Sequence, residues 1–93
     1  MPFIRSVRVA YPGTSNEHVV EVRYSATTTG PLRAGTREAV HAAIRRGERF
    51  RTFDEVTHNQ ADVIARVSPR GTRYIATVAN GRETDNLLHL PRH

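Results

Sequence analysis

The sequence predicts an α+β domain in which a mainly antiparallel sheet of four to six strands packs one helix on one face, in the order β-β-α-β-β-β. Three observations support this prediction: apolar residues alternate at period two near the N-terminus, one segment has apolar residues at helical spacing, and short turn sequences follow one another in the second half. The 93 residues have room for a single domain, residues 1–93.

Two alternating segments, residues 3–11 and 18–26, predict an N-terminal hairpin. The PGTSNE segment between them is rich in turn-forming residues. The residues that share the apolar parity and are expected to face the core are Phe3, Val7, Val9, Tyr11, Val20, Val22, Tyr24 and Ala26.

A polar stretch, residues 27–35, predicts a loop, and the helix is expected over residues 37–46. Thr36 is placed to cap its N-terminus and Gly47 to end it in a left-handed conformation. The apolar stripe that should press this helix on the sheet consists of Ala39, Val40, Ala43 and Ile44.

The second half predicts strands joined by tight turns. Residues 50–53 form either a brief strand or the lead into a turn, and residues 62–68 and 72–78 are strands on either side of an SPRG turn. Asn80-Gly81 favours a type I′ turn before a short strand at 82–84. Asp85 is expected to cap a single helical turn, which the leucines after it anchor to the core.

The opening IRSVRV and the closing YIATVANGRETDNLLHLP resemble a family of small bacterial proteins of unknown function. The closing residues that match are Tyr74, Ile75, Thr77, Gly81, Asp85, Asn86, Leu87, Leu88, Leu90 and Pro91. The family pattern has aspartate where this chain has Asn80, a change that the turn accepts. The resemblance implies no activity. We interpret the motif as structural. The residues expected to have this structural role are Tyr74, Gly81, Asp85, Asn86, Leu87, Leu88 and Pro91.

The sequence favours a non-enzymatic protein. There is no cysteine, no serine in a nucleophile elbow and no glycine-rich phosphate loop, so we expect no catalytic residue and no cofactor. Glu55, His58 and Asp62 have the spacing of metal ligands only on a helix, and their segment lacks helical apolar spacing, so no metal site is expected. No segment has the ~20 apolar residues of a membrane span, and a cytoplasmic protein is expected.

The charge points to an anionic partner. All 14 basic residues are arginine, and the formal net charge is +5. Compositional bias of the source is the alternative explanation for the arginines. Four arginines lie on the outward parity of predicted strands and are therefore the candidate anion-binding residues: Arg8, Arg23, Arg66 and Arg73.

Two features weaken the nucleic-acid interpretation, because Glu21 interrupts the predicted arginine face and no stacking aromatic shares it. The leading hypothesis is a binding module for nucleic acid or an acidic protein surface. The alternative is a structural protein that forms a homo-oligomer by pairing its free sheet edges.

Overall fold

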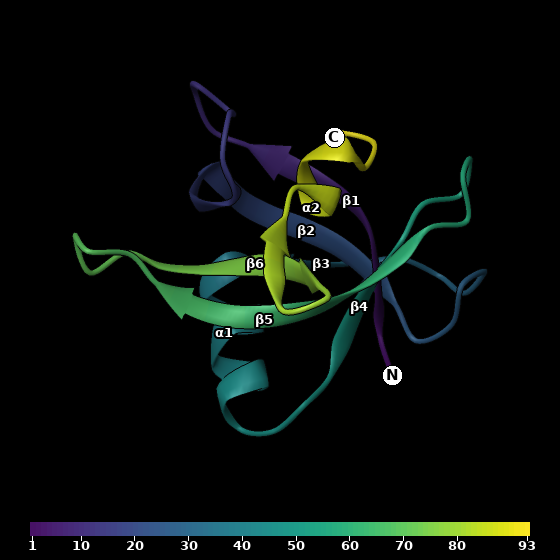
Figure 1. The fold of residues 1–93 in the computed structure, drawn as a ribbon. Coiled ribbons are helices and arrows are strands. Elements are labelled where there is room, and N and C mark those ends of the chain that lie inside the picture. The colour runs from purple at the N-terminus through teal and green to yellow at the C-terminus, as the bar shows by residue number, and fades with distance from the viewer.

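A seven-stranded sheet dominates the computed structural model, which describes residues 1–93 (Figure 1). The chain forms β1 (Phe3–Val9), the 3₁₀ turn η1 (Asn16–His18), β2 (Val19–Ser25), β3 (Arg33–Thr36), α1 (Arg37–Arg45), β4 (Phe50–Phe53), β5 (Gln60–Val67), β6 (Arg73–Ala79), β7 (Arg82–Thr84) and α2 (Asn86–His89). The α+β class and the single longer helix are as predicted, but the sheet is larger than the expected four to six strands.

The strands lie in the order β3-β2-β1-β4-β5-β6-β7. All neighbours pair antiparallel except β1 and β4, which run parallel through Phe3 opposite Arg51 and Ile4 opposite Thr52. The sheet is therefore mixed, because α1 returns the chain to the far side of β1 and starts a second antiparallel series there.

The strand β3 lies where the sequence predicted only loop. It pairs with β2 although its residues are mostly exposed, so main-chain hydrogen bonds hold it at the edge of the sheet. Gly35 leaves room for a neighbouring ring, since a Cβ at this position would lie 3.0 Å from Cε1 of Tyr24. That ring packs edge-to-face on Phe50, with 5.7 Å between the ring centroids.

Two register shifts change which hairpin residues reach the core. In β1 the pairing skips Arg5, so Ile4 and Val7 are both fully buried although they differ in parity. In β2 it skips Val20, and Val19 and Val22 are buried instead. The predicted parity is confirmed for Val7 and Val22 but wrong at Ile4 and Val19, because an irregularity of one residue moves the side chains beyond it to the opposite face.

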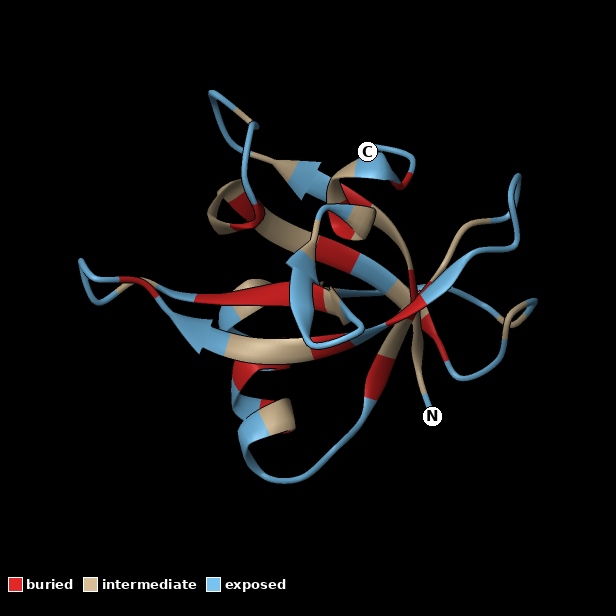
Figure 2. Cartoon of the chain, viewed as in Figure 1, coloured by how far each residue is buried: buried red, intermediate tan, exposed pale blue.

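The sheet curls around one core. Its strands β2 and β6, which are not neighbours in the sheet, contact each other, and α1 packs on β5 and β6 while also touching β2 and β3. Buried residues lie along the crossing strands and on the inward side of α1 (Figure 2). The sequence predicted a sheet with the helix on one face; in the structure the sheet also curls, so that strands as well as α1 enclose the core. The core cluster consists of Ile4, Val7, Val19, Val22, Val40, Ala43, Phe50, Val63, Ile75, Leu87 and Leu90.

The helix α1 begins and ends as the sequence predicted. The Thr36 hydroxyl accepts a hydrogen bond of 3.1 Å from the amide of Ala39, and Gly47 has φ +100° directly after the last turn. Within the predicted stripe Val40 and Ala43 are buried, but Ala39 is exposed and His41 is buried in addition.

The C-terminal residues close the space beside β1. The amide of Val7 donates to the carbonyl of Pro91 at 2.9 Å, and the amide of His93 donates to the carbonyl of Val7 at 3.1 Å. β4 pairs with β1 only at Phe3 and Ile4, and the C-terminal segment lies beside β1 farther along, at Val7 (Figure 1). No helix of this chain is both long enough and apolar enough to cross a membrane.

Candidate nucleic-acid interface

The outer side of the β1–β2 hairpin carries two of the predicted arginines. Arg8 lies opposite Glu21 and Arg23 lies opposite Ser6 in the antiparallel register. Directly opposed residues point to the same side of a sheet, and so do residues two apart on one strand. Arg8 and Arg23 therefore share one surface; both are exposed, and neither makes an ion pair or a side-chain hydrogen bond.

The acid between these arginines is faced by the C-terminal histidine. Nε2 of His93 lies 3.6 Å from Oε1 of Glu21, and Nδ1 of the same ring is 3.0 Å from Oγ of Ser6. The sequence predicted that Glu21 interrupts the arginine face. In the structure its carboxylate lies against a ring from the C-terminus.

A third arginine lies beside the hairpin loop, on the side of β1 that Val7 faces, because Arg92 is directly opposite Val7 in the register. Nη1 of Arg92 lies 3.5 Å from the position that a Cβ on Gly13 would take, so its guanidinium is beside the hairpin loop. Arg92 is exposed and unpaired. No periodic pattern indicated Arg92, because it follows the last predicted element.

Tyr11 lies at the tip of the same hairpin with 97% of its surface exposed. The alternating pattern predicted a strand through residue 11 with Tyr11 on the core side, whereas β1 ends at Val9. The turn-rich segment that follows it was the available signal that the strand stops earlier. Arg8 and Arg23 lie on the outer side of the hairpin, Tyr11 at its tip and Arg92 beside its loop, and we call these four residues the hairpin face.

Arg66 and Arg73 do not join the hairpin face. Nε of Arg66 lies 3.2 Å from Oε1 of Glu83, so its charge is partly neutralised. The side chain of Arg73 points to the opposite side of the sheet from that of Arg66. Arg66 is opposite Tyr74 in the register, and Arg73 is the neighbour of Tyr74 on the same strand, where successive side chains alternate between the two faces. The four predicted arginines therefore lie on three separate surfaces. Arg8 and Arg23 share one of these surfaces, and Arg66 and Arg73 each lie on another.

The C-terminal motif contributes mainly to the core. Leu87 is fully buried and Leu90 is 4% exposed, while Gly81 takes φ +75° in the predicted turn. The expected side-chain cap by Asp85 is wrong. Its carboxylate makes no capping hydrogen bond, and its Oδ2 lies 3.1 Å from Nε2 of His89.

Tyr74 belongs to the same motif and is buried on β6. Its hydroxyl donates to Oε1 of Glu83 at 3.4 Å. Burial, followed by the nearby Glu83 charge, raises the pKa of Tyr74 above its ordinary 10.0.

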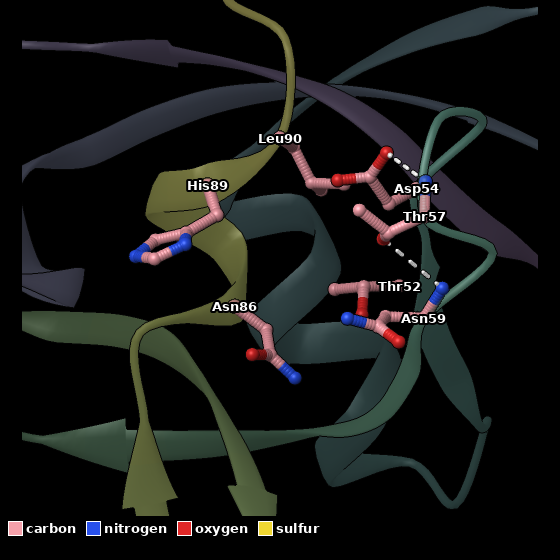
Figure 3. A pocket seen from close by; sticks show the side chains of 7 residues that line it. All are labelled: Thr52, Asp54, Thr57, Asn59, Asn86, His89 and Leu90. Atoms are coloured by element: carbon pink, nitrogen blue, oxygen red, sulfur yellow. Dashed lines mark hydrogen bonds between the residues drawn. The ribbon is translucent and has the colours of Figure 1, made fainter.

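A small polar cavity of about 80 Å³ lies between α2 and the β4–β5 loop (Figure 3). Figure 3 shows the Asn86 side chain extending from α2 toward Asn59, while the ring of His89, also on the α2 side, points away from the β4–β5 loop. The Asp54 carboxylate in its wall accepts hydrogen bonds from the amides of Val56 and Thr57, at 2.8 and 3.2 Å. Since a water molecule occupies roughly 30 Å³ in the liquid, the cavity has room for solvent and little else.

The three residues with metal-ligand spacing diverge in the structure. Glu55 pairs with Arg5, Asp62 pairs with Arg51, and His58 stacks on Phe53 with ring centroids 5.8 Å apart. No group of three or more His, Cys, Asp or Glu side chains could hold a metal ion.

Comparison with known proteins identifies a family but no activity. The family described as "Protein of unknown function (DUF3892)" matches residues 3–91. No curated protein and no solved structure matches the chain.

Proposed function

The chain belongs to the DUF3892 family, whose function is unknown, and we propose that it is a non-enzymatic module that binds nucleic acid through the hairpin face. The observation that carries this proposal is the position of Tyr11, which is 97% exposed at the tip of a hairpin with unpaired arginines on its outer side. We further propose that the protein acts in the bacterial cytoplasm, where both single strands and duplexes are present.

Two kinds of contact are available on the hairpin face. Guanidinium groups bind phosphate oxygens in a bidentate manner, and Arg8, Arg23 and Arg92 have no internal acid to bind first. An exposed phenol ring stacks on an unpaired base, which typically contributes about 1 to 3 kcal/mol per base. Together these contacts favour a single strand with little sequence preference.

An acidic protein surface is the less favoured partner. It would use the arginines but would leave the exposed ring without a specific role, whereas every base offers a face for stacking. Homo-oligomerisation through sheet edges is also less favoured, because the two edge strands, β3 and β7, have only four and three residues.

The decisive experiment is fluorescence anisotropy with a labelled mixed-sequence single-stranded DNA. Replacing Arg8, Arg23 and Arg92 together by Gln should weaken binding at least tenfold, as expected when about three phosphate contacts are lost. The matched control replaces Arg49, Arg70 and Arg82 by Gln. These three arginines are also exposed and unpaired, so the net charge falls equally while the hairpin face stays intact.

The salt dependence gives a second readout. Three phosphate contacts predict a slope of log affinity on log salt of about −2 for single-stranded DNA. The hairpin variant should lose most of this slope and the control variant should keep it. Equal loss of affinity in both variants would show that only overall charge matters, and the proposed interface would be wrong.

A further inference from the structure

A groove of about 440 Å³ lies between α1 and the turn end of the β5–β6 hairpin, away from the hairpin face. Its walls include Ala42 and Arg45 from α1, and Val67 and Arg73 from the two strands. Val67 and Arg73 are directly opposed in the register, so both side chains point to the side of the sheet that α1 covers. We call this the α1 groove.

The α1 groove carries an excess of unpaired positive charge. Arg45 and Arg73 make no ion pair, although they come from different elements and line the same space. Arg46 also lines the groove and lies 3.3 Å from the carboxylate of Glu48. The one acid in the wall, Glu38, has its carboxylate 2.7 Å from Nε of Arg37. The two free guanidinium groups are therefore not neutralised from within the chain.

A buried polar side chain lies in the same wall. His41 is 6% exposed, and its Nε2 is buried without a hydrogen-bond partner. An unpaired buried polar atom typically costs about 1 to 3 kcal/mol, so its position beside two unpaired arginines calls for a reason. Nε2 itself has no exposed surface, so the polar contacts that the groove offers to a ligand come from the two arginines.

The groove also has an apolar part. Val67 is 56% exposed, which is unusual for a valine on a packed strand, and Ala42 lies beside it in the groove wall. The volume falls within the range of about 300 to 1,000 Å³ typical of small-molecule sites. A ligand that fits must combine an anionic group with an apolar portion.

We propose that the α1 groove binds a small organic phosphate, with the phosphate held by Arg45 and Arg73 and the organic portion packed on Val67 and Ala42. Planar guanidinium forks match the tetrahedral oxygens of a phosphate group. This site is separate from the hairpin face, and it does not depend on nucleic-acid binding there.

The test is an NMR titration of the full chain with phenyl phosphate, inorganic phosphate and benzyl alcohol as separate probes. Phenyl phosphate should shift the amide resonances of His41, Arg45, Val67 and Arg73, with a Kd of about 1 mM or below. Inorganic phosphate should shift the same resonances at least severalfold more weakly, and benzyl alcohol should leave them unchanged. Equal affinity for both phosphates would overturn the organic part of the proposal.

The variants separate this site from the hairpin face. Replacing Arg45 and Arg73 by Gln should weaken phenyl phosphate binding about tenfold or more, because two charge-assisted hydrogen-bonding groups are lost. Replacing Arg49 and Arg82 by Gln is the matched control and should leave binding unchanged. If the groove variant binds like the parent, or if the shifts cluster at Tyr11 and Arg8, the proposed site is wrong. The DNA affinity of the groove variant is measured in a separate experiment, because DNA binding bears on the hairpin face and not on the α1 groove.

Discussion

The side-chain amide of Asn16 donates a hydrogen bond of 2.9 Å to the backbone carbonyl of Thr84. This carbonyl also accepts a hydrogen bond from the hydroxyl of Thr77 at 3.0 Å. The contact joins η1, near the start of the chain, to Thr84 within the C-terminal motif, directly before Asp85. It helps to hold that motif against the first hairpin.

Replacing Asn16 by Ala should lower the free energy of unfolding by about 1 kcal/mol, the usual net value of a buried hydrogen bond. The loss is limited because Thr84 keeps its bond from Thr77. Urea unfolding followed by circular dichroism measures it. Asn59→Ala serves as the control, since Asn59 is exposed and should change stability by less than about 0.5 kcal/mol. An unchanged midpoint for Asn16→Ala would contradict the role of this contact.

The closing motif should affect stability through its leucines and not through its acid. Leu87→Ala is expected to cost about 2 to 5 kcal/mol, because Leu87 is fully buried in the core. Asp85→Ala should cost less than about 0.5 kcal/mol, since its carboxylate caps no helix and contacts only the exposed His89. Thermal unfolding compares the two variants. A large loss for Asp85→Ala with a small one for Leu87→Ala would reverse this interpretation.

Most turns and helix ends could be predicted from local sequence signals. Thr36 caps α1, Gly47 ends it, and Asn80 and Gly81 both have positive φ in the tight turn before β7. These features depend on a few neighbouring residues, whose conformational preferences hold in most contexts. Asp85 is the exception, because its side chain contacts His89 instead of the helix amides.

The register and the curl of the sheet could not be predicted from the sequence. Skipping Arg5 in the pairing depends on where β1 must meet both β2 and β4, which is a property of the assembled sheet. The edge strand β3 gave no apolar pattern at all, since its pairing is made by the main chain. The outward parity correctly placed Arg8 and Arg23 on one surface. It could not show that Arg66 and Arg73 lie elsewhere, because strand order and register are properties of the assembled sheet.

Tyr74 should make the fold sensitive to alkaline pH. Burial, and then Glu83, raise its pKa above 10.0, so the folded chain keeps the phenol proton at a pH where the unfolded chain releases it. Its contribution to stability is therefore complete below pH 10 and is lost as the pH rises from about 10 through the raised pKa. Urea midpoints measured across this range should fall with pH, and they should fall less steeply in Tyr74→Phe. The same pH slope in both proteins would contradict this assignment.

Tyr11 should contribute to DNA binding without contributing to the fold. Its side chain is almost entirely exposed, so Tyr11→Ala should change the free energy of unfolding by less than about 0.5 kcal/mol. If the ring stacks on a base, the same substitution should weaken binding of single-stranded DNA by about 1 to 3 kcal/mol, which is roughly fivefold to a hundredfold. Tyr11→Phe keeps the ring and should retain most of the affinity.

The salt slope separates stacking from charge. Tyr11→Ala should leave the slope of log affinity on log salt unchanged, because no phosphate contact is lost, whereas Arg8→Gln should reduce its magnitude by roughly 0.7 for single-stranded DNA. Anisotropy titrations at several salt concentrations measure both effects. If Tyr11→Ala binds like the parent while Arg8→Gln changes the slope, the surface contacts phosphates alone and duplex DNA should bind equally well. If neither substitution has an effect, the hairpin face is not the interface.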